Sequence, residues 1–197
     1  MLLSVSVRQS GVINNLKYSW SPTLNIAPSH SDRLAYSDES LKEILRTVRT
    51  IAMVGASANP VRPSNFAMKY LQGKGYRIIP VNPGHAGKDI HGEITYASLD
   101  DIPGKFEMVD IFRASDAVGP IMNKAIELAP EKGIQVVWMQ LAIRNDEAAI
   151  KGQQAGLTVI MDRCPKIEYA RLFGELGWGG INSGIISSKR PKLTRKI

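Results

Sequence analysis

Short apolar segments alternate with amphipathic ones along most of this chain, and that alternation limits the folds it can adopt. Apolar runs predict strands at 50–54, 76–81, 94–96, 108–112, 135–139 and 157–161. Apolar residues at helical spacing predict helices at 38–48, 64–72, 120–128, 145–156 and 167–173. Because strands buried on both faces read as continuous apolar runs, the pattern predicts a doubly wound α/β fold. We expect a mainly parallel, Rossmann-like sheet with helices on both faces.

The basic character of the chain belongs to its two ends. The formal net charge is +7, yet residues 32–188 hold as many Lys and Arg residues as Asp and Glu residues. Residues 189–197 carry five cations and residues 1–31 carry two, with no acid in either segment. We therefore predict one folded domain at 36–173, a flexible extension at 1–35, and a Gly-rich, then basic tail at 174–197. A solubilising tail is preferred to one that binds RNA or lipid, so no nucleic-acid partner is expected.

Cysteine content and hydropathy limit the compartment. A single cysteine excludes an internal disulfide framework and is typical of a reducing compartment. No apolar run approaches the roughly 18 residues of a membrane span, so no membrane partner is expected. We predict a cytoplasmic protein. Residues 1–31 are Ser-rich and acid-free, which leaves mitochondrial import open as the alternative.

The loop after the first expected strand is typical of a nucleotide-binding turn. Residues 51–65 read IAMVGASANPVRPSN, which is the strand, turn and helix order of a dinucleotide-binding unit. The glycine fingerprint of such units is incomplete, because Ser57 and Pro60 occupy its second and third glycine positions. The turn therefore predicts phosphate binding without the close backbone approach that a tightly laid pyrophosphate needs.

Every loop that follows one of the five main strands carries a cation. These residues are Arg62; His85 with Lys88; Arg113; Arg144; and Arg163 with Lys166. Since such loops share one edge of a parallel sheet, we expect an anionic ligand at that edge.

The stretch from Ile44 to Lys88 narrows the choice of anion. It contains seven cations and no acid, so the carboxylate that accepts from the ribose hydroxyls of NAD is absent. A phosphorylated ribose suits this stretch better, which leaves NADP or coenzyme A (CoA). Ser57 at the second glycine position weakens NADP without excluding it.

Five separated motifs carry a family resemblance. VGASANPVRPSN, YRIIPVNPGHAGKDIHG, MVDIFRAS, VVWMQL and VIMDRCPKIE occur in that order. Over residues 36–170 they resemble the small stand-alone CoA-binding-domain proteins of the YccU type. More distantly, they are similar to the CoA-binding domain of the succinyl-CoA synthetase alpha subunit. The resemblance implies a Rossmann-like domain that binds CoA or acyl-CoA at the carboxyl edge of its sheet.

The resemblance, together with the basic loops, predicts the residues that contact the ligand. They are Gly55, Ala56, Ser57, Arg62, Ser64, Asn65, Asn82, Pro83, His85, Lys88, Phe112, Arg113, Ala114, Trp138, Met139 and Gln140. Trp138 either stacks on adenine or belongs to the core. Cys164 lies between two cations, Arg163 and Lys166, which would lower its thiol pKa and allow a mixed disulfide with CoA. A buried, inert thiol is the preferred alternative.

The residues that catalysis would need are not evident in the sequence. No paired carboxylates, metal-ligand cluster or Ser-His-Asp set stands out, so we expect no metal and a binding protein rather than an enzyme. Asp110 and Asp162 at strand ends are expected to be local hydrogen-bond acceptors. The protein would act as a carrier, a sensor or a regulatory protein. An NADP-binding, oxidoreductase-like protein and an accessory subunit of an acyl-CoA-using enzyme remain alternatives, and the oligomeric state stays open.

Overall fold

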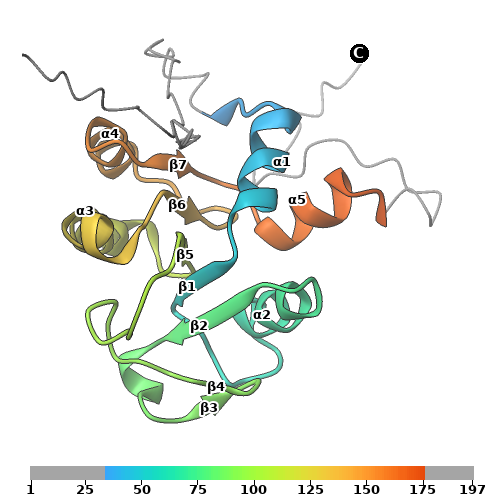
Figure 1. Cartoon of the computed structure of the whole chain (residues 1–197), viewed down its shortest axis with the longest axis vertical. Coiled ribbons are helices and arrows are strands. Elements are labelled where there is room, and N and C mark those ends of the chain that lie inside the picture. The colour runs from blue at the N-terminus through green and yellow to red at the C-terminus, as the bar shows by residue number, and fades with distance from the viewer. Residues whose placement is uncertain (1–33, 176–197) are drawn as a thin grey trace, which may run out of the picture.

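Five parallel strands form the main sheet in the computed structural model, which describes residues 34–175 (Figure 1). In spatial order they are β2 (Arg77–Val81), β1 (Thr50–Val54), β5 (Met108–Ile111), β6 (Val136–Met139) and β7 (Thr158–Ile160). The middle residues of β1 and all residues of β5 and β6 are buried, as expected for strands covered on both faces. The predicted fold class is confirmed. Most of the expected extension and basic tail lies outside the described residues.

Two layers of helices cover the sheet. α3 (Val118–Lys132) and α4 (Asp146–Gln154) lie on one face, and α1 (Asp38–Thr47), α2 (Pro63–Gly73) and α5 (Pro165–Leu172) lie on the other (Figure 1). Alternate strand residues serve the two faces: Ala52 and Val109 pack under α3 and α4, whereas Met53 packs against the opposite layer. No helix within the described residues is long and apolar enough to cross a membrane.

The helix ends follow from local residues. Asn145 caps α4 as predicted, because its Oδ1 accepts the backbone N–H of Ala148 at 2.9 Å. α3 is longer than the expected 120–128 and runs through Pro130. Pro130 falls in the last turn of α3, and Gly133 closes that turn with a left-handed φ of 79°. The apolar spacing in the sequence predicts only residues 120–128 and misses the first residues and the last turn of α3.

The connection from β2 to β5 contains no α-helix. It forms a 3-10 turn (Pro83–His85) and a two-stranded antiparallel hairpin of β3 (Asp89–Ile90) and β4 (Glu93–Ile94). The expected strand at 94–96 is therefore only partly correct, since Tyr96 makes an isolated bridge to Val81. Three buried side chains further on, Leu99, Ile102 and Phe106, cover the sheet on the α3 side. They replace the covering helix that this connection lacks.

Candidate functional site

The strand order creates one natural crevice at the carboxyl edge. β1 lies between β2 and β5, so the chain leaves β1 toward one side and leaves β5 toward the other. In doubly wound sheets, ligands bind at this point, where the strand order reverses. The loops after β1, β2 and β5 flank this point, and we call them the open half of the edge (residues 55–62, 82–88 and 112–114). The loops after β6 and β7 form the closed half (residues 140–145 and 161–164).

Gly55 brings two loops of the open half into contact. Its φ is +90°, and its backbone N–H donates to the carbonyl oxygen of Val81 at 2.9 Å. A Cβ at this position would lie 2.8 Å from the carbonyl oxygen of Phe112, closer than real Cβ contacts come. Both the left-handed backbone and the close approach of the loop after β5 therefore require glycine.

Two asparagine side chains fix the turn that follows Gly55. The Nδ2 of Asn82, at the end of β2, donates to the carbonyl oxygen of Ala56 at 2.7 Å. The Nδ2 of Asn65, in the first turn of α2, donates to the carbonyl oxygen of Ser57 at 2.9 Å. With its carbonyls held from both sides, the turn has a defined shape before any ligand arrives.

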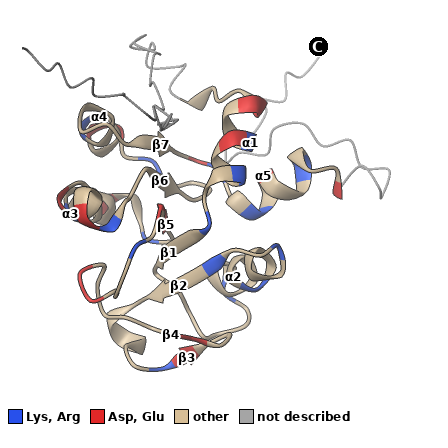
Figure 2. Cartoon of the chain, viewed as in Figure 1, with Lys and Arg blue, Asp and Glu red and all other residues tan. Residues whose placement is uncertain are grey.

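The turn leaves backbone donors available. Within residues 34–175, no hydrogen-bond acceptor is found for the N–H groups of Ala56, Ser57 and Ala58. α2 begins immediately beyond with Arg62 as its N-cap, and the side chain of Arg62 does not cap the helix. α2 also carries no acidic residue (Figure 2). Free N–H groups beside an uncapped helix N-terminus form a typical anion-binding arrangement.

The cations of the open half are available to a ligand. Arg62, Lys88 and Arg113 are exposed and form no ion pair within the described residues. His85 is half-buried, and its Nδ1 is buried with no hydrogen-bond partner in that part of the chain. The remaining predicted positions in these loops, Pro83 and Ala114, are exposed, whereas Phe112 is half-buried and its N–H donates to Val54.

The two arginines of the closed half are engaged within the protein. The guanidinium of Arg144 holds the carboxylate of Asp146 through Nε at 3.0 Å and Nη2 at 2.8 Å. Arg163 is 4% exposed and donates to the carbonyl oxygens of Leu34 and Asp162, each at 2.8 Å. Lys166 lies over the ring of Tyr70, on the α5 side of the sheet. Arg144 and Arg163 are thus held within the protein, and Lys166 belongs to α5 rather than to the closed half.

The comparisons with known proteins agree with this geometry. The family model described as "CoA binding domain" matches residues 49–170, which includes every loop of both halves. The chain belongs to the CoA-binding-domain family. The Bacillus subtilis protein YneT, described as uncharacterized, is 37% identical over 135 residues, which cover 68% of this chain and 95% of YneT.

Solved structures give a matching result. A hypothetical protein from Pyrococcus horikoshii OT3 has 40% sequence identity and a TM-score of 0.66 over 71% of this chain and 94% of its own. The Thermus thermophilus protein designated cell-free ID.343 has 35% identity and a TM-score of 0.66, over 70% of this chain and 100% of its own. These relatives span the CoA-binding domain of this chain and little more.

Within this CoA-binding domain, several predicted contacts are buried. Trp138 and Met139 are 0% exposed, and the indole Nε1 of Trp138 donates to the carbonyl oxygen of Arg163 at 2.9 Å. Stacking of Trp138 on adenine is therefore ruled out by its position in the core, and the alternative core role is correct. Ser64 and Asn65 are buried at the start of α2, so Asn65 shapes the turn rather than facing solvent.

Gln140 lies at the border between the two halves, and its side chain is also engaged within the protein. Its Nε2 donates to both carboxylate oxygens of Asp110, at 2.8 and 3.1 Å. Burial raises the pKa of Asp110 to about 7, although the hydrogen bond from Gln140 acts in the opposite direction. The Oδ1 of Asp162 accepts the N–H of Ala142 at 2.8 Å. The prediction that Asp110 and Asp162 are local acceptors is confirmed.

The thiol of Cys164 is not activated. Cys164 is 8% exposed, and burial raises its pKa to about 11 despite hydrogen bonds from the backbone of Ile167 and Lys166. The expected lowering of this pKa is wrong, because burial of the thiol outweighs the effect of the flanking Lys166. The preferred alternative, a buried and inert thiol, fits the structure.

One residue of the site was not predicted. The Nε2 of His91, in the β3–β4 turn, lies 2.9 Å from the Oδ1 of Asn65, and His91 has a left-handed φ of 52°. His91 therefore supports Asn65, which in turn holds Ser57. The sequence signal was weak, because only the DIHG turn after Lys88 sets His91 apart from other loop residues. The described residues contain no cluster of three or more His, Cys, Asp or Glu side chains that could hold a metal ion.

Proposed function

We propose that this protein binds coenzyme A or an acyl-CoA in the open half of the carboxyl edge. The observation that carries the proposal is the contact at Gly55, where a turn with free N–H groups meets the loop bearing Arg113. The pyrophosphate of CoA would lie over this turn and the start of α2. Arg62, Lys88 and Arg113 would then meet the remaining phosphate charge.

The end of β2 favours CoA over NAD. NAD-binding domains place a carboxylate there for the ribose hydroxyls, whereas this chain has Asn82, and Asn82 is committed to the carbonyl of Ala56. The loop beyond it offers Lys88 and the unpartnered Nδ1 of His85. A phosphorylated ribose, as in CoA, fits these groups better than an unmodified one.

We propose a carrier, sensor or regulatory role rather than catalysis. Asp110 is fully buried and Cys164 is nearly so, which keeps both side chains out of a ligand's reach. The buried, single cysteine also fits a protein of the reducing cytoplasm. Acetyl-CoA incubated with the protein should be recovered intact by mass spectrometry, and hydrolysis or transfer of the acetyl group would contradict this role.

Isothermal titration calorimetry with four ligands tests the binding proposal. CoA should bind at least tenfold more tightly than dephospho-CoA, because a charge-assisted hydrogen bond contributes about 1.5–3 kcal/mol. NAD and NADP should bind more weakly than CoA. Tight binding of NADP without binding of CoA would favour the oxidoreductase-like alternative and overturn the proposal.

A further inference from the structure

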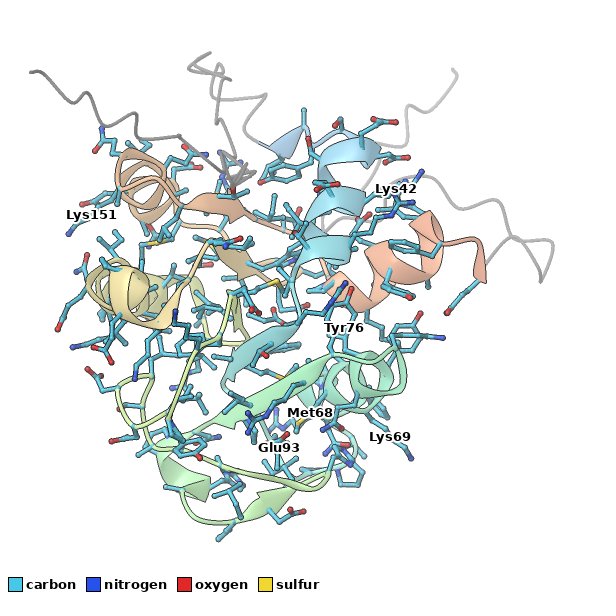
Figure 3. The ribbon with its side chains drawn as sticks, in the orientation of Figure 1. Lys42, Met68, Lys69, Tyr76, Glu93 and Lys151 are labelled. Atoms are coloured by element: carbon cyan, nitrogen blue, oxygen red, sulfur yellow. The ribbon has the colours of Figure 1, made fainter. Side chains whose placement is uncertain are left out.

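A cavity of about 420 Å³ lies at the amino-terminal edge of the sheet, opposite the candidate CoA site. It is formed where α1 and α2 end, and α5 closes one side. The lining residues used in the argument below are Arg46, Arg49, Lys74, Tyr76, Tyr169 and Phe173. None of them belongs to the candidate CoA site. Figure 3 shows Tyr76 beside the end of α1, and Tyr76 immediately precedes β2.

Three aromatic rings form one wall of this cavity. The rings of Tyr169 and Phe173 are stacked with centroids 4.4 Å apart, and Tyr76 meets Tyr169 edge-on at 6.1 Å. The hydroxyl of Tyr76 donates to the carbonyl oxygen of Leu45, which fixes that ring. Burial raises the pKa of Tyr76 to about 12. The cavity therefore presents flat apolar surface in a fixed orientation.

Cations surround the aromatic wall. The guanidinium carbon of Arg46 lies 5.8 Å from the ring centroid of Phe173, and the Nζ of Lys74 lies 5.9 Å from that of Tyr169. Arg49 donates to the carbonyl oxygens of Arg46 and Val48, so it serves chiefly to cap α1. Capping does not account for Arg46 and Lys74, whose charged ends lie over rings.

One carboxylate of the chain, that of Glu175, already contacts a cation of this cavity. Glu175 pairs with the Nζ of Lys74 and accepts the hydroxyl of Tyr70, and these two contacts lower the pKa of Glu175. Arg46 and Arg49 form no ion pair among residues 34–175. An anion is thus accepted at one end of the cavity, while the positive charge at the other end is not neutralised.

We propose that this cavity binds a small aromatic anion, a flat ring that bears a phosphate group. The ring would pack against Tyr169 and Phe173, and the phosphate would accept from Arg46 and, in place of Glu175, from Lys74. The volume, near the lower end of the range for small-molecule sites, suits a ligand of nucleoside monophosphate size or smaller. This second site is independent of CoA binding at the opposite edge.

Phenyl phosphate is the probe, titrated into the full chain saturated with CoA and followed by calorimetry and by amide NMR. The backbone amide of Gly75, which lines the cavity, should shift. Inorganic phosphate and benzyl alcohol, which carry the charge alone and the ring alone, should each bind at least fivefold more weakly. If inorganic phosphate bound as tightly as phenyl phosphate, the aromatic ring would contribute nothing to binding, and the proposal would be overturned.

Charge-removing variants locate the binding. Arg46→Gln and Lys74→Gln should each weaken phenyl phosphate binding about fivefold, in line with charged contacts at a partly exposed site. Lys69→Gln is the matched control, because Lys69 points outward from α2 in Figure 3 and does not line the cavity. Arg113→Ala, at the opposite edge, should leave phenyl phosphate binding unchanged. Absence of binding to the full chain, or equal binding by the two Gln variants and the control, would overturn the proposal.

Discussion

The two halves of the carboxyl edge carry similar residues and use them differently. In the open half, Arg62 and Arg113 are exposed and unpaired among the described residues. In the closed half, Arg144 holds Asp146, and Arg163 is buried among backbone carbonyls and Glu168. A cation at the end of a parallel strand is thus as able to hold the protein together as to hold a ligand. The exposed arginines follow β1 and β5, the two strands that flank the strand-order reversal, whereas the engaged arginines follow β6 and β7.

The difference follows from what lies beyond each loop. α5 and the residues before α1 pack over the closed half, where Asp38, Glu168 and Arg171 form an ion-paired group beside Arg163. The connection that leads from β2 to β5 consists of a 3-10 turn, a hairpin and turns, with no α-helix. The closed half is therefore built for stability, and the open half remains accessible.

The largest effect is expected when Arg163 is replaced. Arg163→Ala removes donors to Leu34 and leaves the fully buried Glu168 with Arg171 as its remaining cation. Loss of one partner in such a buried group should lower the free energy of unfolding by about 3–5 kcal/mol, measured by urea denaturation. CoA affinity of the remaining folded protein should stay within twofold. If Arg163→Ala lost much of its CoA affinity while its free energy of unfolding stayed unchanged, Arg163 would belong to the binding site. The contrast between the two halves would then be wrong.

The next effect concerns Asp110, whose hydrogen bond with Gln140 joins the two halves. Its pKa is about 7 in the folded protein and about 4 in an unfolded chain, so between these values the folded state holds the extra proton. Stability should therefore fall as pH rises from 5 to 7, on the order of 2 kcal/mol, and level off above pH 7.

Urea denaturation at pH 5, 6, 7 and 8 measures this slope. Asp110→Asn should remove the part of the slope that Asp110 contributes, because an amide of the same shape cannot titrate. The Asn variant keeps a buried polar group within reach of Gln140, so it should fold. An unchanged slope in Asp110→Asn would mean that other groups carry the pH dependence.

A smaller effect is expected at Gly55, where the open half is assembled. Gly55→Ala strains a φ of +90° and places a Cβ 2.8 Å from the carbonyl oxygen of Phe112. Gly156→Ala is the matched control, with a φ of +87° and no atom within 4 Å of the new Cβ. Gly55→Ala should destabilise by about 1–2 kcal/mol more than this control and should weaken CoA binding. Equal effects of the two variants would mean that the contact with Phe112 has no role.

The fold was predictable because strands that are buried on both faces consist of continuous apolar residues, which are easy to recognise in a sequence. The strands from Thr50 and from Met108 read as continuous apolar runs and were placed within one residue. The direction in which a loop side chain points has no comparable sequence pattern. Arg113 and Arg163 both follow a strand and both precede a small residue, and the sequence predicted ligand contacts for both loops. Arg163 is held by Glu168 of the adjacent α5 and by the carbonyl oxygen of Leu34, which lies 129 residues away in the chain and meets Arg163 only in the folded protein.

The last prediction compares two arginines of the basic loops, Arg113 from the open half and Arg144 from the closed half. Arg113→Ala should weaken CoA binding about tenfold, which is about 1.4 kcal/mol, because an exposed and unpaired guanidinium next to the Gly55 turn would lose its contact with phosphate. Its effect on stability should stay within about 0.5 kcal/mol, as is usual at the surface. Arg144→Ala, whose guanidinium holds Asp146, should change CoA affinity by less than twofold. Calorimetry at two salt concentrations should show the Arg113 contribution shrinking at higher ionic strength, since salt screens exposed charges. Equal loss of affinity in both variants would extend the ligand site across the closed half, and no loss in either would move it away from this edge altogether.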